Sequence, residues 1–352
     1  MSQDKSSKKV SDIVAEILAE EKVSHVFAIS GGASLHLIHS LADNPNIQYI
    51  CNHNEQASAM AADGYSRVSG STGVAVTTSG PGATNLITGI CCSYYDSVPS
   101  LFITGQVSTM RMKGKTGVRQ IGFQETPIVE VVEPITKYAY TIKKPNEIKY
   151  QIQKALSIAR SGRPGPVLID IPDDIQRELV SIEDLDSFKV TPKEVKVELE
   201  IEMKKIMEQI KISKRPILIA GWGIHLSKTK TEFIKFAENL NIPIALTWGA
   251  ADLIPHDHKL YIGTFGTHGT RHANFAVQNA DLIISLGSRL DTKSTGSPIN
   301  TFARDAYKIM VDIDVNELNK FEHFDLKFDQ LIHCDLLDFF SNIKNHNLIR
   351  SD

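Results

Sequence analysis

Short apolar runs that alternate with helical patterns constrain the fold of this chain more than any other feature. In the N-terminal half, strand-like runs such as 73–77 and 166–171 are apolar on both faces, and helical patterns separate them. Runs of this kind are typical of parallel strands in a sheet that helices cover on both sides. This pattern predicts an α/β fold with a doubly wound, mainly parallel sheet over residues 8–175. The predicted strands are 24–30, 47–52, 72–79, 99–105 and 165–172, and the predicted helices are 34–43, 55–70, 84–95 and 146–162.

The pattern stops at 176–199 and then starts again. Residues 176–199 are charged, poorly periodic and interrupted by Pro192, which predicts a linker over the surface. From 200 to 352 a second doubly wound, Rossmann-like domain is predicted. Its predicted helices are 200–213, 231–241 and 272–280, and its predicted strands are 215–223, 242–248, 281–288 and 307–315.

Composition narrows the classes of function. The chain has 352 residues and a formal net charge of -3, which argues against a nucleic-acid partner because such a partner needs a basic face. No apolar run is long enough to cross a bilayer, and the polar N-terminus lacks the apolar core of a signal peptide. The cysteines have neither metal-ligand nor redox spacing, so we expect reduced, buried thiols in a cytoplasmic protein. They are Cys51, Cys91, Cys92 and Cys334.

The stretch "TTSGPGATN" (77–85) joins a predicted strand to a predicted helix through two glycines and a proline. Free N–H groups at such a helix start favour a bound anion or polar ring. The stretch matches neither the Walker pattern nor Gly-x-Gly-x-x-Gly, and Pro81 has no N–H to donate to a phosphate. A tight turn with proline at a helix start is the alternative from local sequence alone.

Two further turns strengthen the interpretation as a binding site. The segments 29–34 and 53–67 also follow predicted strands, and the carboxyl ends of parallel strands meet at one edge of a sheet. We therefore expect the three turns to converge on one crevice, with Glu55 at its mouth. An acid that only complements the helix dipole is the simpler interpretation of Glu55.

Several long segments resemble one enzyme family. The segments "HNEQASAMAADGYSR", "GVAVTTSGPGATNLITGI", "SVPSLFITGQV", "GFQE" and "GRPGPVLIDIP" resemble the N-terminal, pyrimidine-binding domain of thiamine-diphosphate enzymes, and of acetolactate synthase in particular. The segments "FGTHGTRHANFAVQNADLIISLGSRLDTKSTG" and "VDIDVNELNK" resemble the central domain of the same family, which binds FAD in acetolactate synthase.

The resemblance implies a role for the crevice. It would hold the aminopyrimidine of thiamine diphosphate, with Glu55 bonded to ring nitrogen N1′ and exchanging a proton with it. Gln124 would face the substrate carboxyl or the 4′-amino group. The other implied cofactor contacts are Gly32, Ala33, Thr78, Gly80, Pro81, Gly82 and Asn85. The implied reaction is decarboxylation of a 2-oxo acid such as pyruvate, followed by carboligation to a second 2-oxo acid.

In the central domain the resemblance implies a possible FAD site. The implied contacts are Gly221, Gly223, Gly266, His268, Gly269, Arg289 and Asp312. Two alternatives stay open: this domain binds no ligand in many relatives and another nucleotide in others. The segment "RLDTK" also differs from the "RFDDR" of acetolactate synthase.

In complete members of the family a third domain carries Gly-Asp-Gly and a downstream Asn, which hold Mg²⁺ and the diphosphate. This chain contains no Gly-Asp dipeptide, so we expect no metal ligands in it and interpret it as a fragment, a split subunit or a truncated product. The complete enzyme is expected to be a homodimer or homotetramer. The loop 111–125 departs from the shorter acetolactate synthase segment, so a related 2-oxo-acid decarboxylase or lyase stays open. A non-catalytic cofactor-binding subunit is a further alternative.

Overall fold

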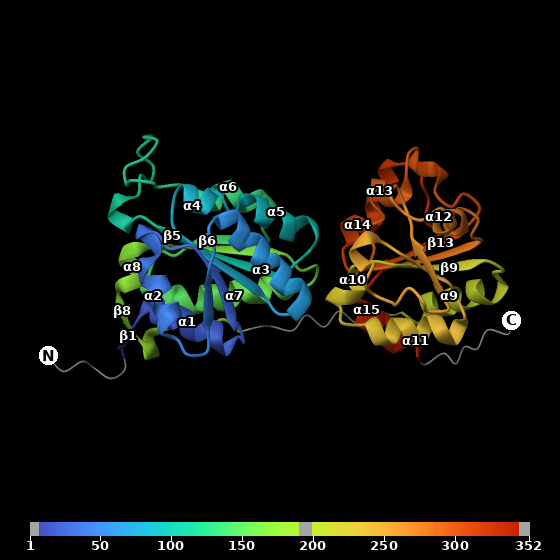
Figure 1. Cartoon of the computed structure of the whole chain (residues 1–352), viewed down its shortest axis with the longest axis horizontal. Coiled ribbons are helices and arrows are strands. Elements are labelled where there is room, and N and C mark those ends of the chain that lie inside the picture. Colours follow the sequence, from blue (N-terminus) through green and yellow to red (C-terminus); the bar gives the residue numbers. More distant parts are fainter. Residues whose placement is uncertain (1–6, 190–198, 345–352) are drawn as a thin grey trace. The chain divides into compact units, whose positions relative to one another are not determined.

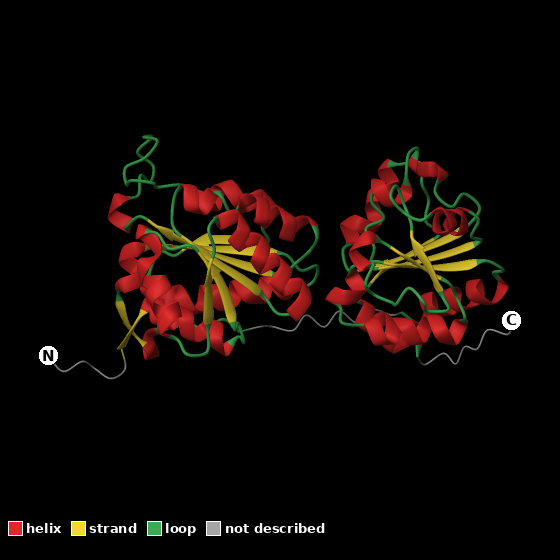
Figure 2. Ribbon diagram, viewed as in Figure 1, coloured by secondary structure: helices red, strands yellow, loops and turns green. Residues whose placement is uncertain are grey.

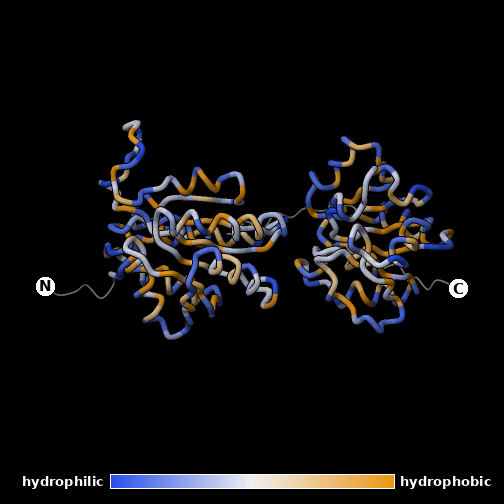
Figure 3. The backbone as a smooth tube through the Cα atoms, turned by 45° about the horizontal axis from the view of Figure 1, so that its top comes forward, coloured by the Kyte–Doolittle hydropathy of each residue, from blue (hydrophilic) through white to orange (hydrophobic). Residues whose placement is uncertain are grey.

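The computed structural model describes residues 7–189 and 199–344 (Figure 1). The chain divides into a first unit, Met1–Pro192, and a second unit, Lys193–Asp352. Each unit has its own parallel sheet between layers of helices, as Figure 2 shows. The alternation of hydrophobic and hydrophilic segments that predicted these layers can be followed along the chain in Figure 3. Two α/β domains with parallel sheets are therefore confirmed.

The first unit contains a six-stranded parallel sheet in the order β3-β2-β4-β5-β7-β6. Its strands are β2 (His25–Ala28), β3 (Gln48–Cys51), β4 (Gly73–Thr77), β5 (Ser100–Gln106), β6 (Tyr138–Thr141) and β7 (Pro166–Pro172). The chain runs from β2 outward to β3 and then returns to the other side of β2. This reversal is a topological switch point, where the chain leaves neighbouring strands for helices on opposite faces of the sheet.

Two layers of helices cover this sheet because each helix buries one apolar stripe. One layer contains α1 (Val10–Glu20), α2 (Leu35–Asp43), α7 (Ile148–Arg160) and α8 (Asp173–Arg177), and the other contains α3 (Glu55–Ser69), α4 (Pro81–Thr84), α5 (Ile87–Tyr95) and α6 (Ile128–Val132). Small residues on α3 allow a close approach to the sheet. A Cβ at Gly73 would lie 1.9 Å from the Ala62 carbonyl oxygen.

The second unit contains a six-stranded parallel sheet in the order β11-β10-β9-β12-β13-β14. Its strands are β9 (Pro216–Ala220), β10 (Ile244–Leu246), β11 (Tyr261–Thr264), β12 (Leu282–Leu286), β13 (Tyr307–Asp312) and β14 (Gln330–His333). Counted along the chain, this is the order 3-2-1-4-5-6 of dinucleotide-binding folds. The Rossmann-like arrangement is thus confirmed, and its switch point lies between β9 and β12.

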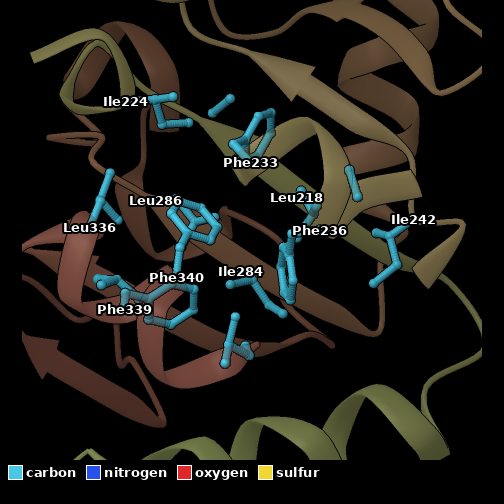
Figure 4. Close-up of a cluster of buried hydrophobic side chains, with 14 of the residues drawn as sticks. Leu218, Ile224, Phe233, Phe236, Ile242, Ile284, Leu286, Leu336, Phe339 and Phe340 are labelled. Carbon is cyan, nitrogen blue, oxygen red and sulfur yellow. The ribbon is translucent and has the colours of Figure 1, made fainter. Parts of the chain in front are cut away.

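The larger core of the second unit lies between its sheet and one helical layer (Figure 4). Phe236 packs edge-on against Phe339 and Phe340, with ring centroids 6.2 Å and 5.9 Å away. The helices of this layer are α9 (Glu200–Ile212), α10 (Gly223–Leu226), α11 (Lys230–Leu240) and α15 (Leu336–Ile343). The opposite face carries α12 (Arg271–Gln278) and α14 (Val315–Asn319), and α13 (Thr292–Thr295) follows β12.

The segment predicted as a linker differs from the structure at its start. Strand β8 (Leu179–Ser181) pairs antiparallel with β1 (Ser7–Lys9), and Val180 is buried in the first core. The partner strand lies at the other end of the unit's sequence, so local periodicity could not reveal the pairing. Residues 190–198 of the predicted linker lie outside the described residues.

The cysteines match the prediction only in part. All four are free, but only Cys334 is buried and Cys51 is exposed. The prediction of buried thiols is wrong for Cys51 because it ends β3, an edge strand with β2 as its one neighbour in the sheet. Among the described residues, no helix is long and apolar enough to span a membrane.

Candidate functional site

The loops after β2 and β4 meet at the switch point of the first unit. Ala28 and Val76 are register partners near the ends of these strands. The Ala33 amide donates a hydrogen bond to Thr78 Oγ1 at 3.2 Å. A Cβ at Gly31 would lie 2.5 Å from the Thr78 side chain, so only glycine allows the two loops this close. The loops after β2 and β4 are therefore in contact at the edge where the turns predict a crevice.

Glu55 stands at this edge because it is the first residue of α3. Asn54 caps the helix by accepting from the Gln56 amide at 2.8 Å, and an acid in the first turn is stabilised by the helix dipole. The half-buried Glu55 accepts a hydrogen bond at Oε2 from Asn85 Nδ2 at 2.9 Å. No hydrogen bond to Glu55 Oε1 occurs within residues 7–189 and 199–344. One carboxylate oxygen is thus held in place while the other can bind a ligand.

The Gly-Pro-Gly turn at 80–82 lies beside this carboxylate. Pro81 occupies the first position of α4, and Gly80 precedes it with a φ of +59°, a conformation that favours glycine. A Cβ at Gly82 would lie 2.6 Å from Thr78 Cγ2 and 3.6 Å from Glu55 Oε1. Gly82 therefore lies between the threonine and the acid, and a larger residue would fill the space beside both.

Gln124 approaches the same turn from a different loop. A Cβ at Gly80 would lie 2.7 Å from Gln124 Cβ and 3.0 Å from the Gln124 carbonyl oxygen. Gln124 itself has a φ of +62°, which is uncommon for a residue other than glycine. Gly32, next to Ala33 in the chain, is exposed, and a Cβ added to it would have no neighbour within 4 Å. All the residues predicted for the pyrimidine crevice thus lie in the turns and short helical starts that follow strands of this sheet.

Sequence reasoning missed a buried carboxyl group behind this edge. Asp170 on β7 is fully buried, and its burial raises the pKa to about 7 from an ordinary value of 3.8. It accepts hydrogen bonds from Thr104 Oγ1 at 2.7 Å, Gln106 Nε2 at 3.0 Å and Thr141 Oγ1 at 3.2 Å, which oppose that rise. The available signal was an aspartate inside the otherwise apolar run "PVLIDIP".

In the second unit, the glycines at the switch point pack against each other. A Cβ at Gly221 would lie 2.1 Å from the Gly287 carbonyl oxygen, and one at Gly223 would lie 2.7 Å from Gly287 Cα. Likewise, a Cβ at Gly266 would lie 2.4 Å from the Lys293 carbonyl oxygen, and one at Gly269 the same distance from Phe265 Cα. Backbone packing alone therefore requires all the glycines predicted for this site.

The polar residues predicted for the second unit lie at the same edge of its sheet, but each makes different contacts. The His268 ring packs against Trp248 with centroids 4.7 Å apart, and Arg289 is half-buried after β12. Asp312 is buried, and its Oδ1 accepts from the Asp314 amide at 2.9 Å. Part of the Asp312 carboxylate is thus used to form the turn after β13. Within the described part of the chain, no three His, Cys, Asp or Glu side chains form a metal-binding group.

Comparison with known proteins identifies the class of this fold and site. Residues 8–129 match the N-terminal TPP binding domain of thiamine pyrophosphate enzymes, and residues 203–330 match the central domain of these enzymes. The chain therefore belongs to the thiamine pyrophosphate enzyme family.

Its relatives carry a more particular name. The chain is 41% identical over 320 residues to the probable acetolactate synthase large subunit of Methanocaldococcus jannaschii, covering 89% of this chain and 52% of the relative. It is 40% identical over 317 residues to acetolactate synthase 2, chloroplastic, of Nicotiana tabacum, covering 89% and 46%. For the acetolactate synthase large subunit of Lactococcus lactis the identity is 37% over 343 residues, covering 97% and 58%. The chain thus spans about half the length of the curated relatives it matches.

Proposed function

We propose that the first unit binds the aminopyrimidine ring of thiamine diphosphate, as part of an enzyme that decarboxylates a 2-oxo acid and joins the remaining fragment to a second 2-oxo acid. Pyruvate and acetolactate are the proposed substrate and product. The observation that carries the proposal is the Glu55 carboxylate, which Asn85 holds through one oxygen at the switch point. The names of the relatives support the particular reaction.

The residues at the crevice fit an aminopyrimidine by their chemistry. A ring nitrogen needs one partner that can share a proton, and Glu55 Oε1 is a carboxylate oxygen without a hydrogen bond among the described residues. Thr78 Oγ1 accepts from the Ala33 amide, so its own hydrogen can be donated to a polar ring atom. The small residues Gly80 and Gly82 leave the backbone close to a flat ligand.

We derive the role of each residue from this arrangement. Asn85 occupies Oε2 and so orients the carboxylate of Glu55, which leaves Oε1 as the oxygen that shares the proton. A positioned carboxylate of this kind transfers protons without first reorganising. Gln124 packs against Gly80 at the same turn, and we assign to its side-chain amide the contact with the substrate carboxyl or the 4′-amino group. Thiamine diphosphate, when bound, supplies the electron sink for the decarboxylation.

The other predicted ligands stay predictions. The space beside the central-domain glycines is filled by the chain's own backbone, so the presence of these glycines does not by itself favour FAD. Arg289 is the predicted residue whose guanidinium suits a diphosphate. Visible flavin absorbance of the purified protein would test FAD binding. Mg²⁺, a homodimer or homotetramer and a cytoplasmic location are likewise expected of the complete enzyme.

Calorimetry tests the proposed binding. Thiamine diphosphate with Mg²⁺ would be titrated into this chain, alone and together with a separately supplied diphosphate-binding domain of a relative. We expect measurable binding in the second titration. No binding in either titration would contradict the proposed enzyme and favour a non-catalytic subunit that has the fold without the cofactor site.

A product assay tests the reaction. The protein at its native length would be incubated with pyruvate, thiamine diphosphate and Mg²⁺, and the products would be separated. Acetolactate is the expected product. Acetaldehyde in its place would indicate a decarboxylase that uses the same crevice.

A further inference from the structure

The loop of residues 112–124 projects from the first unit without helix or strand (Figure 1). It follows the turn η2 (Thr109–Arg111) and leads into α6. Three of its apolar side chains are exposed, Phe123 most of all at 85%. A long loop with little apolar burial keeps one conformation only when polar contacts hold it, because ordering each residue costs backbone entropy.

A single buried carboxylate joins the two arms of this loop. Glu125 is 7% exposed. Its Oε1 accepts from the Lys113 amide at 2.6 Å, and its Oε2 accepts from the Ile121 amide at 2.9 Å. Hydrogen bonds to an ionised acceptor are about twice as strong as neutral ones. Glu125 therefore joins the two arms of the loop at its base.

The backbone on either side of Glu125 is held as well. Gln120 Nε2 donates to the Glu125 carbonyl oxygen at 2.9 Å. Gln106 Nε2 donates to the Thr126 carbonyl oxygen at 2.8 Å, and the same nitrogen donates to Asp170. The segment that contains Gln124 is thus fixed both to the loop and to the sheet.

We propose that Glu125 is the positioning residue that holds Gln124 against Gly80 at the crevice, and this inference rests on the proposed function. Gln124 has a φ of +62° and lies within 3.0 Å of the Cβ position of Gly80. Such a backbone conformation is strained for a residue other than glycine and persists only where neighbouring contacts enforce it. Glu125 supplies those contacts from the next position in the chain.

Amide hydrogen exchange tests the clamp without any cofactor. In Glu125→Gln the side chain keeps one acceptor and turns a donor toward the other amide. We expect exchange at Lys113 and Ile121 to become about 10-fold faster or more, the equivalent of one lost charge-assisted hydrogen bond. Glu125→Asp keeps the charge but is shorter by one methylene, so its increase should be smaller.

The matched control is Glu133→Gln, which makes the same chemical change at an exposed residue after α6. Its exchange at the two loop amides should equal that of the wild type. Unchanged exchange in Glu125→Gln, in a protein with an unaltered melting temperature, would overturn the clamp.

A double-mutant cycle on kcat/KM at native length tests the positioning. Glu125→Gln should lower kcat/KM by about 10-fold, because misplaced catalytic groups lose rate steeply. In a Gln124→Ala background the same change should lower it by less than about 2-fold, since Gln124 is then no longer there to be positioned. A merely structural role for Glu125 would give equal losses in both backgrounds.

The two measurements separate the possible failures. Faster loop exchange with equal kinetic losses in both backgrounds would overturn the positioning role and leave the proposed function intact. A Gln124→Ala enzyme with wild-type kcat/KM would overturn the role proposed for Gln124 itself, and the positioning role with it.

Discussion

The two sheets of this protein place glycines at equivalent points and use them differently. At the switch point of the first unit, Gly82 would bring an added Cβ against the side chain of Thr78 and near the Glu55 carboxylate. At the switch point of the second, Gly221 would bring it within 2.1 Å of a carbonyl oxygen of Gly287. Gly82 thus makes room beside polar side chains, whereas Gly221 lets two turns of backbone cross.

This difference shows that a glycine-rich turn at a sheet edge does not by itself indicate a ligand. Glycine follows each of the strands β4, β9 and β12, and all three are buried parallel strands. At the first sheet the Glu55 carboxylate stands beside the turn, and its Oε1 is free of hydrogen bonds from the described residues. The neighbouring side chains, rather than the glycines, therefore distinguish the two edges.

The largest expected effect tests the carboxylate of the first edge. Glu55→Gln at native length should slow hydrogen–deuterium exchange at C2 of bound thiamine diphosphate by about 10²- to 10⁴-fold, because a general acid–base group is removed. Nuclear magnetic resonance of quenched samples measures this exchange. The melting temperature should not change. Wild-type exchange in the variant would place the proton-sharing group elsewhere, and Glu133→Gln is the control.

The next effect tests the backbone crossing of the second edge. Gly221→Ala should lower the free energy of unfolding by about 3 kcal/mol, because backbone cannot move aside as a flexible side chain can. Urea denaturation followed by circular dichroism measures the loss. A stability within about 0.5 kcal/mol of the wild type would mean that the two turns separate easily, and that this edge has room for a ligand after all.

A smaller effect concerns the buried acid behind the first edge. Burial raises the pKa of Asp170 to about 7, so the folded state keeps a proton that the unfolded state loses above its ordinary pKa of 3.8. The stability from this group is full below about pH 4 and falls as the pH rises to 7. We expect the free energy of unfolding to drop by about 2 kcal/mol between pH 5 and pH 7 from this group.

Asp170→Asn should remove this slope, because the amide does not titrate. Urea denaturation at several pH values measures it. The exposed Asp184→Asn variant is the control and should keep the slope of the wild type. A steeper or equal slope in Asp170→Asn would assign the pH dependence to other groups.

The smallest expected effect on stability sharpens the contrast with Gly221. An added methyl group at Gly32 has no neighbour within 4 Å, so Gly32→Ala should change the free energy of unfolding by less than about 0.5 kcal/mol. It should still weaken thiamine diphosphate binding in calorimetry, since the methyl group would stand beside the proposed ring. Gly64→Ala also has open space, lies within α3, and should leave binding unchanged. Equal binding by both variants would move the ring away from Gly32.

Much of the fold could be predicted because the central strands have a strong signal. Strands such as β4, β5 and β7 are buried along their whole length, and burial on both faces gives the uninterrupted apolar runs seen in the sequence. The edge strands β6 and β14 were not predicted. They are only partly buried, as the half-exposed Tyr138 and the exposed Leu331 illustrate, so their runs resemble loops.

The candidate site was predicted from its turns and from Glu55. The buried carboxyl groups near it, Glu125 and Asp170, were not predicted. Glu55 follows a strand and begins a helix, which the sequence pattern alone indicates. Glu125 and Asp170 are buried carboxyl groups. The Asp170 partner Thr104 is distant in sequence. The Glu125 side chain, by contrast, accepts from the Lys113 and Ile121 amides of its own aperiodic loop. Residue type alone favours solvent exposure for both, so only the assembled structure could place them.

The antiparallel pair of β1 and β8 brings residues 7–9 and 179–181, which lie near the two ends of the first unit's sequence, side by side. A module whose entry and exit are neighbours can be inserted into another polypeptide, or circularly permuted, without pulling its layers apart. Such a geometry allows segments attached beside this strand pair to be exchanged while the parallel sheet stays intact.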